Sequence, residues 1–243
     1  MSKVGEVNKN NKGSEMILVR YKDDSDIDVF FPEYNYTKTT RYIQFKNGTV
    51  KCPYDRTVHG VGYIGEGEYV VSINKKNTKA YTIWNNMLRR CYDEEFHKRE
   101  PSYIGCEVCD EWHNFQNFAQ WYEKNYYEVE GERMCLDKDI INKGNKIYSP
   151  DNCVFVPVKI NNLFIKRDNK RGDLPIGVKR EYNKFTTHMS NTYLGLFNTP
   201  HEAFLMYKLN KELLIQGMTR EYKDKIPVKL YNALMNYKVD END

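Results

Sequence analysis

A short acidic motif and two later asparagines are the residues of this chain best suited to chemistry. The motif is Leu136-Asp137-Lys138-Asp139; Asn152 follows Asp137 by fifteen residues, and Asn161 follows it by twenty-four. Carboxylate and amide oxygens suit a hard cation such as Mg²⁺, and a lysine can contact a phosphate as a fixed cation. These residue types favour metal or phosphate chemistry, provided that the fold brings them together.

The segments around these residues predict two strands and a helix, preceded by two further helices. Each preceding helix carries an apolar stripe at helical spacing, and Asn114 is a favoured residue for the start of the second. The stripes, which we expect to be buried, are Trp84, Met87, Leu88 and Cys91, and then Phe115, Phe118, Ala119 and Tyr122. The later elements are expected at residues 133–140 (first strand), 147–152 (turn), 153–157 (second strand) and 159–166 (helix).

With two upstream motifs, this spacing resembles that of the phage-encoded HNH endonucleases. The motifs are Trp84-x-x-Met87-x-x-Arg90-Cys91 and Cys109-Asp110-Glu111-Trp112-x-x-Phe115. The resemblance implies a strand–strand–helix unit that cuts DNA with one divalent cation. It implies that Asp137 and Asn161 are ligands of Mg²⁺ and that Asn152 braces the loop.

Lys138 departs from that family, which has its general-base histidine at this position. An ammonium with a pKa of about 10.4 is almost wholly protonated near neutral pH, so it does not readily accept a proton from water. Lys138 is therefore expected to contact phosphate. Asp139, or His113 from another element, remains a candidate for the base, which leaves phosphodiester cleavage open.

Four of the six cysteines have the residue types of a zinc site. Without an export signal we expect reduced thiols. Cys106-x-x-Cys109 could join Cys135 and Cys153 around Zn²⁺, although the second pair is not in the C-x-x-C form. The alternative is a set of buried thiols without metal.

The C-terminal part predicts three strands followed by a helix that starts at Thr199-Pro200-His201-Glu202, a capping box. It resembles the DNA-binding domain of plant ethylene-response factors and some phage integrases, whose sheet enters the major groove. The markers are Gly177-Val178, Phe185, Leu194-Gly195-x-Phe197 and Thr199-x-x-Glu202-Ala203. The resemblance implies that Lys179, Arg180, Tyr182 and Lys184 contact DNA. One side of the helix is expected to carry Ala203, Met206, Tyr207, Leu213 and Leu214, and a last helix over residues 222–237 should break at Pro227.

The first third of the chain reads as β structure. Apolar runs border the turn at residues 22–26, and Asn47-Gly48 is the best hairpin signal. The acidic residues Asp23, Asp24, Asp26 and Asp28 are expected to form a solvated turn. Residues 60–65 match G-x-G-x-x-G, but residues 68–72 read as a strand, whereas a dinucleotide fingerprint needs a helix there.

Charge is distributed unevenly although the net charge is only +3. Residues 91–139 hold 13 acidic and 5 basic residues, whereas residues 159–229 hold 14 basic and 7 acidic residues. A basic half beside an acidic half indicates a nucleic-acid-binding module joined to another part. The predicted divisions are an unstructured lead (1–15), a small β domain (16–80), an HNH-like domain (81–167), a linker (168–176) and a sheet-plus-helix domain (177–243).

These patterns predict an α+β protein that binds double-stranded DNA. We expect a phage or mobile-element protein of the HNH endonuclease type with doubtful or weak metal-dependent nuclease activity. The alternative is a non-catalytic phage counter-defence protein, of the anti-CRISPR kind, that binds a host nuclease or its DNA. Since no apolar run approaches the roughly 18 residues of a membrane span, we expect it in the host cytoplasm.

Overall fold

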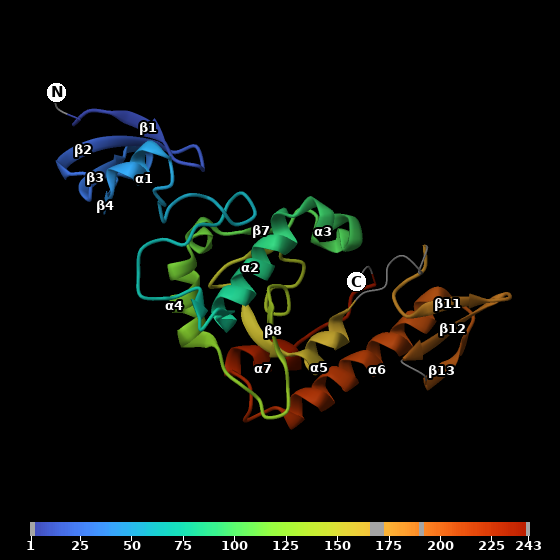
Figure 1. Cartoon of the computed structure of the whole chain (residues 1–243). Coiled ribbons are helices and arrows are strands. Elements are labelled where there is room, and N and C mark those ends of the chain that lie inside the picture. The colour runs from blue at the N-terminus through green and yellow to red at the C-terminus, as the bar shows by residue number, and fades with distance from the viewer. Residues whose placement is uncertain (1–2, 166–172, 190–191, 242–243) are drawn as a thin grey trace. The chain divides into compact units, whose positions relative to one another are not determined.

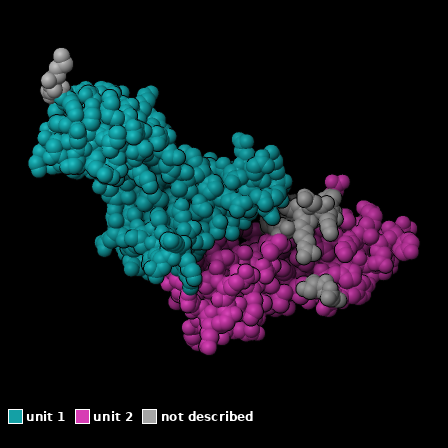
Figure 2. Space-filling model, viewed as in Figure 1, with its two compact units in different colours: residues 1–124, 147–149 teal, residues 125–146, 150–243 magenta. Residues whose placement is uncertain are grey.

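The computed structural model describes residues 3–165, 173–189 and 192–241, and its fold is α+β (Figure 1). The chain divides into two compact units. Unit 1 comprises residues 1–124 and 147–149, and unit 2 comprises residues 125–146 and 150–243 (Figure 2). Residues 147–149 join unit 1 because Ile147–Tyr148 (β9) pairs in parallel with Glu107–Val108 (β7).

A four-stranded antiparallel sheet begins unit 1, in the order β1-β2-β3-β4. Alternate side chains of a strand point to opposite faces, and the apolar ones here share one face and form a small core with Phe45. The fully buried strand residues are Met16, Leu18, Ile27, Val29 and Phe31. The strands are β1 (Val7–Lys9), β2 (Glu15–Asp23), β3 (Asp26–Phe31) and β4 (Tyr36–Thr40), with a 3₁₀ turn, η1 (Pro32–Tyr34), between the last two.

The expectation of an unstructured lead over residues 1–15 is corrected by this sheet. Residues 7–9 form β1, which pairs antiparallel with β2. Asn10 and Ser14 are buried, and their side chains donate hydrogen bonds of 2.8 and 2.6 Å to the carboxylate of buried Asp55. Polar contacts rather than apolar burial hold this segment. Its polar composition therefore wrongly suggested an unstructured segment.

The expected hairpin at Asn47-Gly48 is wrong. Residues 42–46 form a short helix, α1 (Tyr42–Lys46), and Asn47 caps its end in the right-handed region. Gly48, the next residue, has a φ of +67°, which is outside the helical region. A glycine in the left-handed region just after a helix is a common helix ending, so the Asn-Gly pair stops a helix here.

The glycines of residues 60–65 pack against neighbouring side chains. Gly62 faces Trp84 and Leu88, and Gly65 faces the side chain of Asn114, so a side chain at either position would clash. The segment continues into a hairpin of β5 (Ser72–Ile73) and β6 (Lys76–Asn77). The strand predicted over residues 68–72 is therefore displaced to residues 72–73.

Two amphipathic helices form the rest of the unit 1 core. The predicted stripes are confirmed except at Tyr122, which is half-buried. The buried residues are Trp84, Met87, Leu88, Cys91, Phe115, Phe118 and Ala119. The Thr78 hydroxyl accepts from the Tyr81 N–H (3.2 Å), and Asn114 Oδ1 accepts from the Gln116 N–H (3.0 Å), so each residue caps a helix start. The elements are α2 (Lys79–Tyr92), α3 (Glu94–Arg99), η2 (Pro101–Tyr103), η3 (Asp110–His113) and α4 (Phe115–Asn125).

Unit 2 contains the predicted pair of antiparallel strands, β8 (Met134–Asp137) and β10 (Val154–Pro157). The helix that follows is shorter than predicted: α5 (Val158–Asn161) makes one turn and continues as a 3₁₀ turn, η4 (Asn162–Phe164). These elements share one core with α6 (Pro200–Glu221) and α7 (Val228–Met235). The buried residues of that core include Val154, Val156, Ile160, Ile215, Leu230 and Leu234.

A second part of unit 2 is a three-stranded antiparallel sheet, in the order β11-β12-β13, packed against the first half of α6. The capping box of α6 is confirmed, because the Thr199 hydroxyl accepts from the Glu202 N–H (3.2 Å) and the Glu202 carboxylate accepts from the Thr199 N–H (3.1 Å). The strands are β11 (Val178–Glu181), β12 (Lys184–Met189) and β13 (Thr192–Phe197).

Two expectations about the C-terminal helices change. The single apolar side predicted for α6 is wrong at Leu213, which is 54% exposed, while Ile215 is buried. The last helix begins only after Pro227, at Val228. Lys166 and residues 168–172, predicted to lie in a helix and a linker, are outside the described residues. Among the helices that the structure describes, none is both long and apolar enough to cross a membrane.

The corrected helix ending can be tested at two neighbouring residues. We expect Gly48→Ala to lower the free energy of unfolding by about 1–2 kcal/mol, because an L-residue is strained in the left-handed region. The new methyl group would also lie 2.8 Å from the Lys9 carbonyl oxygen. Asn47→Ala is the matched control and should change stability by less than about 0.5 kcal/mol. Urea denaturation measures both; equal losses would favour the hairpin turn.

Candidate functional site

The loop that joins β8 to β10 begins with Asp137, which ends the strand opposite Val154. Asp137 Oδ1 accepts hydrogen bonds from the backbone N–H groups of Asp139 (2.9 Å) and Ile140 (2.8 Å), so the carboxylate shapes the turn. Burial, and then the negative charge of Asp139, raise the pKa of Asp137 to about 6. The two N–H bonds and the Lys138 ammonium oppose this rise but do not cancel it.

Lys138 is held by the loop itself. Its side chain is only 11% exposed, and Nζ lies 3.3 Å from an Asp139 carboxylate oxygen. Nζ also donates to the Asn145 carbonyl (3.0 Å), while the Asn145 amide donates back to the Lys138 carbonyl (2.8 Å). The ammonium thus joins two sides of the loop, and any phosphate would compete with these partners.

Asn152 braces the same loop from its far end. Its amide group donates to Asn145 Oδ1 (3.2 Å), and its Oδ1 accepts from the Asn142 amide (2.7 Å). The three asparagines form a chain of side-chain hydrogen bonds across the loop. The sequence analysis did not identify Asn142 and Asn145, whose one signal is the polar run over residues 142–146.

The ligands implied for Mg²⁺ are brought into one region, but a complete ligand set is not formed. Asn161 is half-buried at the end of α5, and α5 contacts both β8 and β10. In the described part of the chain no hydrogen bond joins Asn161 to Asp137, and no three His, Cys, Asp or Glu side chains cluster as a metal site. Binding of Mg²⁺ by Asp137 and Asn161 therefore stays a prediction.

His113 has its contacts within unit 1. Its Nε2 lies 3.3 Å from the Tyr92 hydroxyl, and its Nδ1 lies 3.6 Å from an Asp110 carboxylate oxygen. Burial lowers the pKa of His113, so the neutral imidazole is favoured. These contacts account for the residue structurally, and its role as a base stays a prediction.

The four cysteines of the predicted zinc site show the properties of buried thiols. Burial raises the pKa of Cys109, which opposes the thiolate form that zinc requires. The Cys135 thiol donates to the Val156 carbonyl (3.4 Å), and Cys106 and Cys153 are buried. Cys106 and Cys109 belong to unit 1, and Cys135 and Cys153 belong to unit 2. Zinc binding stays a prediction without structural support.

The β11–β12 hairpin holds the residues predicted to contact DNA. Val178 and Phe185 face α6 in the core, so the alternation of side chains places Lys179 and Lys184 on the opposite, open face. Lys184 pairs across the strands with Glu181. Both lysines are exposed. The open face therefore presents two exposed lysines and one exposed glutamate beside the turn, while Thr186 on the same face is buried.

Tyr182 lies in the two-residue turn of this hairpin. It is 93% exposed and has a φ of +52°. That backbone region is costly for a bulky residue, and asparagine or glycine is the usual choice in such turns. Tyr182 therefore combines an exposed aromatic ring with a strained backbone, and its contact with DNA stays a prediction. Its backbone conformation was not readable from the sequence.

Arg180 does not join the open face. It shares the face of Val178, pairs with Phe185, and its guanidinium carbon lies 4.9 Å from the Phe185 ring centroid. Arg180 is exposed and lies over the Phe185 ring at the edge of the core, a contact that the sequence did not indicate. Tyr193, which is exposed and meets the His188 ring edge to face at 5.3 Å, had been missed as an exposed aromatic of the same sheet.

Comparison of the chain with protein families, with curated proteins and with solved structures finds no match.

The raised pKa of Asp137 predicts a pH-dependent stability. The folded pKa of about 6 exceeds the unfolded value of 3.8. The folded state therefore favours the protonated form of Asp137: the contribution of this residue to the free energy of unfolding is greatest below about pH 4 and is lost as the pH rises through 6. We expect Asp137→Asn to be more stable than the parent at pH 8, by up to about 3 kcal/mol, and equally stable at pH 4.

Urea denaturation at both pH values measures this effect, with exposed Asp224→Asn as the control. The amide that Asp137→Asn introduces retains an oxygen for the two backbone N–H groups, so the turn should persist. If Asp137→Asn were more stable than the parent by the same amount at pH 4 and pH 8, ionisation of the Asp137 carboxyl would not be the cause of the difference.

Proposed function

We propose that this chain is a double-stranded DNA-binding protein of the HNH endonuclease type, from a phage or mobile element, with weak or absent cleavage. The β11–β12 hairpin carries the proposal. Strained, exposed Tyr182 lies at its tip, and Lys179 and Lys184 lie on the open face behind it. The other face is fixed by α6, so these side chains are held on a rigid support.

The shape and charge of this hairpin suit the major groove of DNA. A two-stranded ribbon fits into that groove, and lysines on its face reach phosphates while the turn reaches deepest. The excess of basic residues between residues 159 and 229 adds the sequence-independent attraction that dominates affinity for DNA.

The β8–β10 loop supports the nuclease type through its topology and its carboxylates. Antiparallel strands are followed by a helical turn that contacts both, and Asp137 ends the first strand with Asp139 close by. If Mg²⁺ binds, Asp137 and Asp139 would hold it, and the cation would stabilise charge on the scissile phosphate. Lys138 supplies no base, because its ammonium is committed to Asp139 and Asn145.

The internal hydrogen bonds of the loop favour a second candidate, a non-catalytic counter-defence protein. Lys138, Asn145, Asn152 and Asn142 satisfy one another and need no substrate for their order. A former nuclease loop of this kind can serve as a rigid surface for binding a host nuclease or its DNA. Cleavage assays separate the two candidates.

The DNA-binding proposal predicts a change in salt dependence. Replacing Lys179 and Lys184 together by alanine should weaken duplex binding and reduce the slope of log K against log salt by about 2, since each phosphate contact contributes about 0.9. Tyr182→Ala should weaken binding without changing the slope. Fluorescence anisotropy over a salt series measures both effects.

The matched control is Lys75→Ala with Lys76→Ala, two exposed lysines of the β5–β6 hairpin in unit 1. This variant should keep the parent affinity and slope. If it loses as much as the Lys179 and Lys184 variant, or if neither loses anything, the β11–β12 hairpin is not the DNA-binding element.

The nuclease part predicts a gain of function. Lys138→His should raise Mg²⁺-dependent nicking of supercoiled plasmid by roughly a hundredfold or more, because a positioned base is typically worth a hundred- to ten-thousand-fold. Asp137→Ala in the same background is the control and should abolish the gain. Efficient cutting by the parent, lost on Lys138→His, would mean that another residue activates the water.

A further inference from the structure

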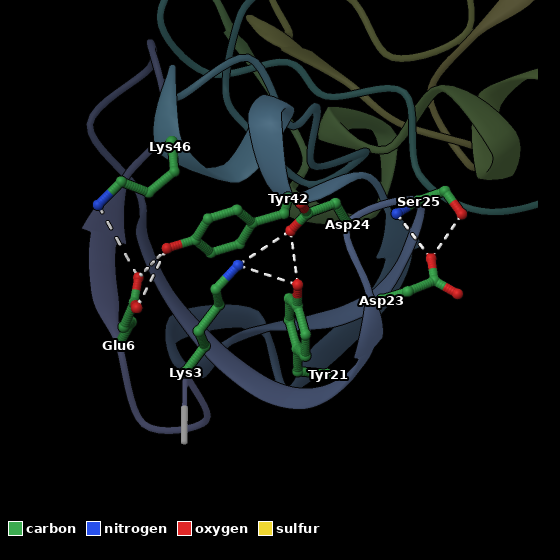
Figure 3. Close-up of polar contacts among 8 residues, drawn as sticks. All are labelled: Lys3, Glu6, Tyr21, Asp23, Asp24, Ser25, Tyr42 and Lys46. Atoms are coloured by element: carbon green, nitrogen blue, oxygen red, sulfur yellow. Dashed lines mark hydrogen bonds and ion pairs between the residues drawn. The ribbon is translucent and has the colours of Figure 1, made fainter. Parts of the chain in front are cut away.

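A lysine ammonium lies between two tyrosine rings at the edge of the N-terminal sheet. Lys3 Nζ is 4.4 Å from the ring centroid of Tyr21 in β2 and 4.0 Å from that of Tyr42 in α1 (Figure 3). The two rings stand edge to face, with centroids 5.8 Å apart and an angle of 89°. Aromatic faces attract cations, so the rings form two walls of a cage.

Asp24 closes the cage on a third side. Its carboxylate lies 2.9 Å from Lys3 Nζ, which also donates to the Tyr21 hydroxyl at 2.9 Å. Two aromatic faces and one carboxylate are the groups that recognise an ammonium. Figure 3 shows all of these groups pointing toward Nζ.

The walls of the cage are braced independently of Lys3. The Tyr21 hydroxyl donates to the Asp24 carboxylate (2.6 Å), and the Tyr42 hydroxyl donates to the Glu6 carboxylate (2.9 Å). The Tyr42 N–H donates to the Asp24 carbonyl (2.9 Å), and the Tyr42 ring stacks on buried Phe45. The cage should therefore keep its shape when Lys3 leaves it.

Lys3 is held weakly compared with the walls. Its side chain is 35% exposed and that of Asp24 is 75% exposed, so water screens their attraction. Its backbone carbonyl accepts one hydrogen bond, from the Glu6 N–H (3.2 Å). Exposed ion pairs and cation–π contacts each shift an equilibrium only about several-fold. An incoming cation can therefore displace Lys3.

The surroundings of the cage favour a cation over an anion. Asp23 ends β2 and Asp24 lies in the turn that follows, while the nearby Glu6 carboxylate lies 3.9 Å from Lys46 Nζ. Two acidic residues of β3 are paired with cations: Arg20 bonds to Asp26 (2.6 Å) and Asp28 (2.5 Å), and Lys22 lies 3.4 Å from Asp26. The local charge that remains around the cage is negative.

We propose that Tyr21, Tyr42 and Asp24 form a binding site for the lysine ammonium of a partner protein, and that Lys3 occupies this site in cis. Lys3 competes with the partner lysine as an intramolecular ligand, with an effective concentration of about millimolar. A partner lysine must bind tightly enough to displace Lys3. It can do so when it belongs to a basic segment that makes several contacts with the protein. This site lies in unit 1 and is independent of the proposed DNA-binding hairpin.

The test compares the full chain with its Lys3→Ala variant. The probe is N-acetyl-lysine methylamide, and N-acetyl-norleucine methylamide is its neutral control. Nuclear magnetic resonance follows the ring signals of Tyr21 and Tyr42 during titration. We expect Lys3→Ala to bind the lysine probe about threefold to fivefold more tightly than the parent, because the competitor in cis is gone, and to ignore the norleucine probe.

Matched variants decide whether the cage causes this gain. Lys22→Ala removes another exposed lysine that pairs with an aspartate, Asp26 (3.4 Å), and should bind as weakly as the parent. In the Lys3→Ala background, Tyr42→Leu removes a wall and Asp24→Asn removes the charge; each should lower affinity by about fivefold or more. Asp24→Asn is an exposed change and keeps the test valid if Tyr42→Leu does not fold.

Three results would overturn the proposal. The first is equal binding of the lysine probe by the parent and by Lys3→Ala. The second is the absence of Tyr21 and Tyr42 shifts in folded Lys3→Ala. The third is undiminished binding after Asp24→Asn.

Discussion

The packing of α6 against two cores is the interaction on which unit 2 depends. Its first half buries Ala203 and Phe204 against the three-stranded sheet, and its second half buries Ile215 against the β8–β10 strands and α7. A helix of 22 residues is about 33 Å long, so one rigid rod supports both the hairpin and the acidic loop. The two candidate sites of unit 2 are thereby held by a single element.

The loop between β8 and β10 shows how polar residues order a segment that has little regular structure. Buried polar groups must be hydrogen-bonded, and the Asp137, Asn145 and Asn152 side chains supply bonds that strands or helices would otherwise supply. The same bonds occupy the groups that chemistry would use. Structural and catalytic roles therefore compete at Lys138, whose ammonium is paired before any phosphate arrives.

Tyrosines serve different purposes in the two units. In unit 1, Tyr21 and Tyr42 form walls that hold a cation, and their hydroxyls are tied by carboxylates. In unit 2, Tyr182 is exposed at the tip of a hairpin in a strained conformation. A tyrosine ring gives a large contact area with few rotatable bonds, so both settings are suited to recognition.

Local patterns in the sequence determined the parts that depend on short-range physics. Periodic apolar residues determined α2 and α4, and the capping box determined the start of α6. Each of these features depends on residues within a few positions of one another.

Only the tertiary structure decided features that depend on distant partners. Asn10 and Ser14 are ordered by Asp55, some forty residues away, so no local signal marked them. Asn47-Gly48 suits both a hairpin and a helix ending, and the burial of Phe45 selects the helix. Arg180 shares the face of Val178 and Phe185 because strand pairing fixes the sheet's register, although its side chain stays exposed. Secondary-structure propensity is a property of each residue alone, whereas the burial of a side chain depends on which surfaces pack together in the folded chain.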